Sequence, residues 1–321
     1  MYVHWNLSPL ESLGALLARG RDAVAFLQGQ LSNDVTTLTA ERSLLAGYHN
    51  PQGRVLALLR LLEVAPGEVL AILPRELVTP VVSRLKAFIL RSKVELADAS
   101  GAWRIEGLIG PGAPEPPSPA PGVAALAPPF AARLPRVPGA VARLGGSFAL
   151  HAGERPPRWL IVSPAEGPGG EPALARCTRT LPERWQRLSV ENGEPQVYAA
   201  TSGEFVAQML NLDVLGAIAF DKGCYTGQEV IARAHYRGRV KRRLQRFGLA
   251  EPLPLMPGDA GELADGRTFR VVDAVRQREG GCEFLAVAPL PGAEPRTEAA
   301  TPGGAARLDA TPLPLPYELP E

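Results

Sequence analysis

Residues 220–229, Phe-Asp-Lys-Gly-Cys-Tyr-Thr-Gly-Gln-Glu, include the side chains best suited to chemistry in this chain. Gly223 and Gly227 flank the cysteine at position 224, and glycines permit a tight backbone path that exposes the thiol. Lys222 lies two residues before Cys224, and a neighbouring cation lowers the pKa of a thiol, so that it acts as a nucleophile or a metal ligand. A small apolar core residue is the alternative, and the spacing alone does not choose between the two.

A run of cations follows this loop. Positions 233–246 hold seven basic residues and no acidic residue: Arg233, Arg237, Arg239, Lys241, Arg242, Arg243 and Arg246. His235 and Tyr236 lie among them. Arginines beside aromatic rings hold phosphates, carboxylates or single-stranded nucleic acid. An anionic ligand and a solvated face are the two interpretations of this run.

A third group precedes the loop, where Trp185 is followed by Glu191-Asn-Gly-Glu-Pro195. A carboxylate beside turn residues can accept hydrogen bonds from the N–H groups of a heterocycle, and a nearby indole can cover the face of that ring. A solvated acid in a turn and a tryptophan in the core are the alternative interpretations.

The composition limits the functions that these residues can serve. The chain has 321 residues, 45% of them apolar, and a net charge of +1. These values predict two or three domains with a real core, and they exclude a protein whose whole surface binds nucleic acid or an anionic membrane. Three cysteines without a CxxC pair and four scattered histidines encode neither a disulfide framework nor a metal site. We expect Cys177 and Cys282 in the core. Without a signal-peptide pattern or an apolar run of about 18 residues, we expect a cytoplasmic protein with reduced thiols.

Hydrophobic periodicity predicts the elements that position these groups. Helices are expected between Asp22 and Leu31 and, with Thr79 as N-cap and Pro80 as first residue, through an apolar stripe that includes Phe88. Three antiparallel strands are expected within 43–73. Further strands are expected at 102–109, 158–163, 244–249, 268–276 and 283–288, the last three in a small antiparallel barrel. Loops are expected at 111–122 and 164–173, and a poorly ordered tail from Pro291.

Four motifs together resemble the hallmark of the YgfZ family of folate-binding proteins. They are Val190-Glu-Asn-Gly193, Asn211-Leu-Asp-x-Leu-Gly-x-Ile-x-Phe220, Lys222-Gly-Cys-Tyr-Thr-Gly-Gln-Glu229 and Arg237-Gly-x-x-Lys-Arg242. The resemblance extends to Phe26-Leu-Gln-Gly-Gln-Leu-x-Asn-Asp-Val35 and to the segment 85–94. The family is related to the aminomethyltransferase of the glycine cleavage system and to mitochondrial factors for iron–sulfur cluster assembly.

The resemblance implies an α+β fold of three domains in a cloverleaf ring around a channel for tetrahydrofolate, which is the aminomethyltransferase-like folate-binding fold. Residues 1–100 and part of 175–243 would form the folate-binding α+β domain. Residues 101–174 would form a central α+β domain with the Pro-rich loop, and 244–321 a small C-terminal antiparallel β-barrel with a tail.

The site residues implied by the resemblance form two groups. The catalytic candidates are Cys224, as the functional thiol, and Lys222. The candidates for binding folate are Glu191 at the pterin, Trp185 facing it, Tyr225, Gln228, Glu229, Arg233 and Arg237. We assign the two arginines to the glutamate tail of folate or to another anion. No metal ligand is implied.

Two positions depart from the related patterns. Aminomethyltransferases carry an acidic pair after the turn of the strand meander, where this chain has Ala57 and Leu58. Without a carboxylate there for proton transfer, glycine cleavage is not expected. Leu13 occupies a position where some family members have another tryptophan at the folate.

The leading hypothesis is a folate-binding accessory protein that supports the assembly or repair of 4Fe-4S proteins and affects tRNA modification through a cluster-containing enzyme. Its expected partners are iron–sulfur enzymes or cluster assembly proteins, because a single ligand-like cysteine cannot hold a cluster unaided. A folate-dependent one-carbon transferase is the second hypothesis, and a module that binds tRNA directly through 233–246 is the third. No membrane partner is expected.

Overall fold

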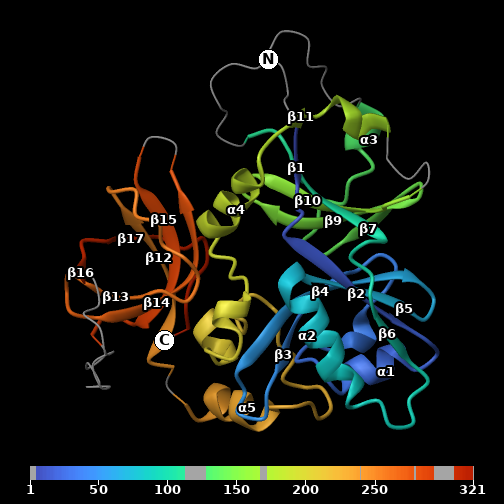
Figure 1. Cartoon of the computed structure of the whole chain (residues 1–321), viewed down its shortest axis with the longest axis horizontal. Helices are drawn as coiled ribbons and strands as arrows, with labels where there is room; N and C mark the ends of the chain where they lie inside the picture. The colour runs from blue at the N-terminus through green and yellow to red at the C-terminus, as the bar shows by residue number, and fades with distance from the viewer. Residues whose placement is uncertain are drawn as a thin grey trace. The chain divides into compact units, whose positions relative to one another are not determined.

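The computed structural model describes residues 5–112, 128–166, 172–238, 240–277, 280–292 and 307–320 (Figure 1). Most of the predicted Pro-rich loop, half of the loop at 164–173 and much of the tail lie outside these residues. The chain divides into two compact units. Unit 1 consists of Met1–Gln28, Asp34–Leu45 and Leu59–Leu188, and unit 2 of Gly29–Asn33, Ala46–Leu58 and Ser189–Glu321.

The strands predicted within 43–73 form part of a five-stranded sheet. Its members are β2 (Leu13–Arg19), β3 (Leu44–His49), β4 (Val55–Ala65), β5 (Glu68–Pro74) and β6 (Glu95–Asp98), in the order β3-β4-β5-β2-β6. β3 is hydrogen-bonded to β4, and β4 pairs antiparallel with β5, which confirms the three strands predicted within 43–73. The predicted first helix is also present as α1 (Ala23–Gln28).

A second sheet lies entirely in unit 1. It contains β1 (Asn6–Pro9), β7 (Trp103–Ile109), β8 (Val141–Leu144), β9 (Ser147–Glu154), β10 (Pro157–Pro164) and β11 (Thr178–Arg179), in the order β11-β1-β7-β10-β9-β8. Apolar residues of both sheets, such as Leu62, Leu70, Phe148 and Leu160, form one buried cluster. The core of unit 1 is therefore the apolar layer between its two sheets.

A second buried cluster of unit 1 includes Trp5, Trp159 and Cys177. The small helices near it are α3 (Pro128–Ala131) and the 3-10 turn η2 (Pro172–Arg176). Burial raises the pKa of the Cys177 thiol to about 12, so this thiol stays protonated at neutral pH. The expectation that Cys177 is a core residue is confirmed.

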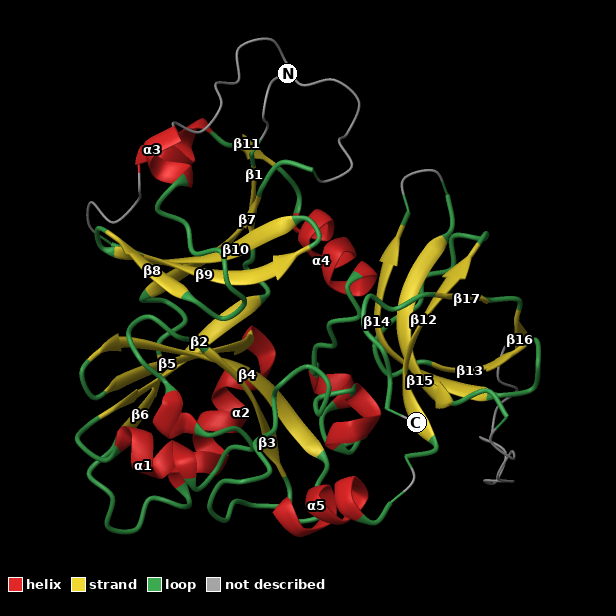
Figure 2. Cartoon of the chain, turned by 180° about the vertical axis from the view of Figure 1, so that it is seen from behind, coloured by secondary structure: helices red, strands yellow, loops and turns green. Residues whose placement is uncertain are grey.

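The C-terminal part of unit 2 is a curled sheet of six strands (Figure 2). They are β12 (Arg242–Leu249), β13 (Ala260–Leu263), β14 (Thr268–Arg276), β15 (Cys282–Pro289), β16 (Arg307–Leu308) and β17 (Thr311–Leu313), in the order β16-β13-β14-β15-β12-β17. In its core Phe284 stacks on Phe247 and packs at a tilt against Phe269, and Cys282 is buried with them. The three strands predicted here are confirmed.

The predicted small antiparallel barrel needs two corrections. β16 runs parallel to β13, and among the described strands β16 and β17 are the unpaired edges of the sheet, which is therefore a half-barrel. Proline explains one edge, because Pro312 in β17 has no N–H with which to extend the ladder.

The prediction for the second helix also needs correction. α2 (Arg75–Lys86) begins before Pro80 and contains it, and Phe88, expected on the buried stripe, lies beyond the helix and is 46% exposed. Leu77 and Val78 in the first turns are buried, so their packing outweighs the hydrogen bond that Pro80 cannot donate. Two helices that carry candidate site residues were not predicted: α4 (Pro182–Glu191) and α5 (Gln228–Tyr236).

Arg243 joins the half-barrel to the 3-10 turn η4 (Ala207–Leu210) and the residues after it. Its guanidinium is 4% exposed and forms a bidentate pair with Asp213, with N–O distances of 2.9 and 3.0 Å. It also donates to the carbonyl oxygen of Gln208 at 3.1 Å. Removal of one partner from such a pair leaves the other charge buried and unpaired.

We predict that Arg243→Ala lowers the free energy of unfolding by about 3–5 kcal/mol. The matched control Lys241→Ala removes an exposed cation next to the same strand and should change it by less than about 0.5 kcal/mol. Urea denaturation followed by circular dichroism measures both values. Equal effects of the two substitutions would contradict the structural role of Arg243.

Candidate functional site

The loop 221–227 lies in unit 2 and leads directly into α5. Cys224 is exposed, whereas its neighbour Tyr225 is buried. Burial raises the pKa of the Tyr225 hydroxyl to about 12, so this group stays protonated. The loop thus turns its thiol outward and its aromatic ring inward, as the flanking glycines suggested for the thiol.

Lys222 fixes this loop to the short segment 29–33. Its ammonium donates to the carbonyl oxygens of Leu31 at 2.6 Å and Asn33 at 2.9 Å. The same Nζ lies 5.0 Å from the centre of the Tyr225 ring, in a cation–π contact. The same segment, 29–33, is held a second time by the side chain of Ser32, whose hydroxyl donates to the carbonyl oxygen of Ala217 at 2.7 Å. In the structure, the ammonium of Lys222 therefore contacts main-chain carbonyls and a ring.

Two glycines let the turn 50–53 approach the other end of the loop. Gly227 has φ +83°, and a Cβ there would lie 2.5 Å from the carbonyl oxygen of Asn50. Gly53 has φ +70°, and its Cβ would lie 2.9 Å from the Cβ of Val230 on α5. A larger residue at either position would meet both backbone strain and steric overlap. The turn that follows β3 therefore supports the start of α5.

His49 is a member of this site that the sequence did not reveal. It is the last residue of β3 and is fully buried, and its ring centre lies 6.2 Å from that of Tyr225. Neither ring nitrogen has a hydrogen-bond partner among the described residues. Burial lowers the pKa of His49 to about 3, so the imidazole is neutral at physiological pH. A lone histidine in a sequence does not signal such burial.

The remaining candidates of the loop motif lie on α5. Gln228 and Glu229 occupy its first turn, Gln228 half-buried and Glu229 exposed. Arg233 and Arg237 are exposed toward its C-terminal end. The structure therefore separates these arginines from the first turn of the helix by one to two turns.

Glu191 is the last residue of α4 and is half-buried. Its carbonyl oxygen accepts a hydrogen bond from Nη1 of Arg246 at 3.3 Å. The turn after it is held by Tyr317, whose hydroxyl donates to the carbonyl oxygen of Gly193 at 2.7 Å. Gly193 has φ +64°, and a Cβ there would lie 2.8 Å from that hydroxyl. The end of α4 is thus fixed by a strand and by the C-terminal segment of unit 2.

Trp185 belongs to unit 1, although it lies on the same helix as Glu191. Its ring covers Gly107 of β7, where a Cβ would lie 2.2 Å from a ring carbon. The guanidinium carbon of the buried Arg158 lies 5.1 Å from the centre of its ring. These contacts fix the indole, which remains half-exposed.

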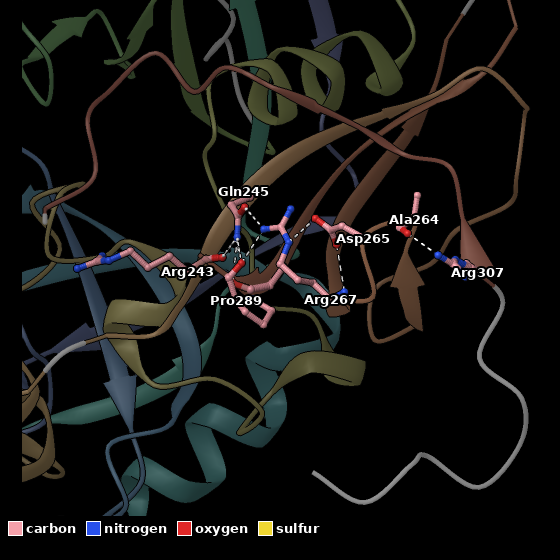
Figure 3. Close-up of polar contacts among 8 residues, drawn as sticks. Arg243, Gln245, Ala264, Asp265, Arg267, Pro289 and Arg307 are labelled. Atoms are coloured by element: carbon pink, nitrogen blue, oxygen red, sulfur yellow. Dashed lines mark hydrogen bonds and ion pairs between the residues drawn. The ribbon is translucent and has the colours of Figure 1, made fainter. Parts of the chain in front are cut away.

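The basic run divides into structural and surface cations. Arg243 pairs with Asp213, and Arg246 pairs with Glu283 at 2.5 Å. Other side chains around β12 form hydrogen bonds with neighbouring residues of the half-barrel: Figure 3 shows Gln245 donating to the carbonyl oxygen of Pro289, and Arg267 donating to Gln245. Gln245 also donates to the carbonyl oxygen of Ala288 at 3.0 Å. The exposed cations of the run among the described residues are Arg233, Arg237 and Lys241, and both interpretations of the run stay open for them. Arg239 lies outside the described residues.

Three further features of the described residues concern metal ligands, the positions of the acidic pair and membrane-spanning helices. No group of three or more histidine, cysteine, aspartate or glutamate residues is placed there to hold a metal ion. Ala57 and Leu58 are buried apolar residues of β4. No described helix is both long enough and apolar enough to cross a membrane.

Comparison with known proteins gives close relatives in sequence and a more distant one in structure. The "tRNA-modifying protein YgfZ" of Edwardsiella ictaluri (strain 93-146) is 33% identical over 306 residues, which cover 93% of this chain and 88% of the relative. The protein of the same name from Yersinia pseudotuberculosis serotype O:1b (strain IP 31758) is 33% identical over 282 residues, with coverage of 86% and 82%. No protein-family model matches the chain.

Among solved structures, the glycine cleavage system aminomethyltransferase T from Bartonella henselae superposes with a TM-score of 0.66. It is 14% identical in sequence, and the match covers 90% of this chain and 79% of that one. This similarity shows the fold, which is an aminomethyltransferase-like α+β fold with several sheets, one of them a half-barrel. The sequence matches span nearly the whole chain, and the chain therefore belongs to the YgfZ family.

Proposed function

We propose that this protein binds tetrahydrofolate or a folate derivative and supports the assembly or repair of 4Fe-4S proteins, with Cys224 as its functional thiol. The observation that carries the proposal is the exposed Cys224 on a loop fixed at both ends. Lys222 holds one end, and the close approach of Gly227 to Asn50 holds the other. A thiol presented in this way can meet a partner protein without a change in the loop.

The residues of α4 fit a folate by their chemistry. A carboxylate such as that of Glu191 accepts hydrogen bonds from the N–H groups of a pterin, and a fixed, half-exposed indole such as that of Trp185 offers a ring for stacking. Six residues of helix separate the two by about 9 Å along the axis. Bound tetrahydrofolate would supply a carrier for a one-carbon unit. The three-domain cloverleaf ring with a central folate channel is part of this proposal.

The positions of Ala57 and Leu58 favour an accessory role over one-carbon transfer. Both are buried apolar residues where aminomethyltransferases carry their acidic pair. Neither can accept or donate the proton that aminomethyl transfer requires. Formation of methylenetetrahydrofolate from tetrahydrofolate and glycine-derived or N-methyl donors, above the background without protein, would favour a transferase instead.

The number of exposed thiols determines how many ligands this protein can offer to an iron–sulfur cluster. A 4Fe-4S cluster takes four cysteine ligands, whereas Cys177 and Cys282 are buried and only Cys224 is exposed among the three cysteines. Any contact with a cluster therefore needs ligands from the partner. A cluster-containing enzyme of tRNA modification as such a partner would agree with the name of the curated relatives.

The first prediction from the proposed function concerns folate. Titration with 5-formyl-tetrahydrofolate should quench tryptophan fluorescence in a saturable way, and Glu191→Ala should weaken binding about 10- to 100-fold, because hydrogen bonds to a charged group are lost. Glu183→Ala, which removes an exposed carboxylate from the first turn of the same helix, is the matched control and should bind as wild type. Equal affinities of both variants would contradict the role of Glu191.

The second prediction separates the thiol from the ligand. Cys224→Ala and Cys224→Ser should keep the fold and bind folate with near wild-type affinity, because the side chain is exposed. Both should fail to restore the activity of 4Fe-4S enzymes in a deletion strain. Cys282→Ala, expressed at a level matched by immunoblot, controls for loss of a thiol as such. Full rescue by the Cys224 variants would refute the thiol role and leave folate binding intact.

A further inference from the structure

The C-terminal end of α5 carries an aromatic cluster that the proposed function does not use. His235 stacks on Phe220, with ring centres 3.7 Å apart and planes 15° apart. Tyr236 meets both rings edge-on, at 4.8 Å from His235 and 6.1 Å from Phe220. Tyr236 is nevertheless 68% exposed. The cluster therefore holds a large ring in a defined orientation while leaving most of its surface to solvent.

Cations accompany this cluster, and the nearest acidic residues in the sequence are Asp221, next to Phe220, and Glu229, one helical turn before Arg233. Arg233 lies in the last turn of α5, and Arg237 is the C-cap residue, whose backbone N–H donates to the carbonyl oxygen of Arg233 at 3.0 Å. Both are exposed, as is Lys241, and no ion pair to any of the three occurs among the described residues. No acidic residue lies between Val230 and Ala250 in the sequence. Arg243 and Arg246 pair with acidic residues of unit 2, whereas Arg233 and Arg237 lie in the last turn and at the C-cap of α5, within three residues of Tyr236 in the sequence.

The combination selects one class of ligand. An exposed ring stacks on the face of an unpaired base, and arginines one helical turn apart can meet successive phosphates of the same strand. A paired duplex hides the faces of its bases, so the rings would add nothing to its binding. We propose that Tyr236, His235, Arg233 and Arg237 form a binding surface for single-stranded nucleic acid. The proposal goes beyond folate binding and does not depend on it.

The test measures fluorescence anisotropy of a labelled single-stranded RNA oligonucleotide of mixed sequence, of the same DNA sequence, and of the RNA duplex, at several salt concentrations. We expect binding of the single strands that exceeds binding of the duplex. Tyr236→Ala should weaken it by roughly tenfold or more, because one stacked base is lost, and Tyr236→Phe, which keeps the ring, should bind as wild type. Tighter binding of the RNA strand than of the DNA strand would identify RNA as the ligand of this surface, and tighter binding of the DNA strand would identify DNA.

The paired substitution Arg233→Gln with Arg237→Gln should reduce the slope of log affinity against log salt by about 1.4, since each single-strand phosphate contact contributes about 0.7. The control replaces Leu90 by Ala and Arg91 by Gln, because Leu90 is 89% exposed and Arg91 is an exposed cation in unit 1. Three results would overturn the proposal. They are an unchanged affinity of Tyr236→Ala for the single strand, an equal loss of affinity in the control, and a higher affinity of the wild type for the duplex than for the single strand. Folate titration of Tyr236→Ala should match wild type, so failure of this surface is distinguishable from failure of folate binding.

Discussion

The ammonium of Lys222 donates to the carbonyl oxygens of Leu31 and Asn33, and this pair of hydrogen bonds ties the loop 221–227 to a segment nearly two hundred residues earlier in the chain. Charged hydrogen bonds of this kind are stronger than neutral ones. The orientation of Tyr225 beneath the ammonium and the outward position of Cys224 both follow from where this attachment places the loop. A lysine two residues before a cysteine suggests activation of the thiol, and the contacts of Lys222 indicate in addition that it positions the loop.

Next to the exposed Cys224, the candidate site contains two buried ionisable side chains, His49 on β3 and Tyr225 in the loop. His49 and Tyr225 are neutral groups enclosed beneath the loop, and their pKa values are shifted away from neutrality in opposite directions by the same burial. For His49 the folded pKa lies below that of the unfolded chain, so the unfolded state binds the proton more readily. The contribution of this group to stability is therefore present above pH 6.5 and is lost as the pH falls from 6.5 toward 3.

Much of the architecture follows from local patterns, and the exceptions have physical causes. The strands at 43–73, 244–249, 268–276 and 283–288 were predictable because apolar runs alternate with turn residues. The start of α2 was not, because packing of Leu77 and Val78 outweighs the signal of Pro80. The edges of the half-barrel were not, because strands as short as β16 leave no periodic pattern.

Some features of the candidate site could likewise be predicted from the sequence and others could not. The burial of Cys177 and Cys282 was expected from the general tendency of free cysteine, whereas the spacing around Cys224 left its exposure open until the chain was folded. The division of the basic run could not be predicted, because the acids that neutralise Arg243 and Arg246 lie 30 and 37 residues away. Long-range pairs of this kind become visible only when the chain is folded.

Amide hydrogen exchange in Lys222→Met tests the positioning role of this lysine most directly. Methionine keeps the apolar stem and removes the two charged hydrogen bonds, so exchange in 221–227 and 29–33 should become about tenfold faster or more, while β14 and β15 exchange as in wild type. Unchanged protection of the loop in this variant would contradict the account, because the loop would then be held by contacts other than those of Lys222.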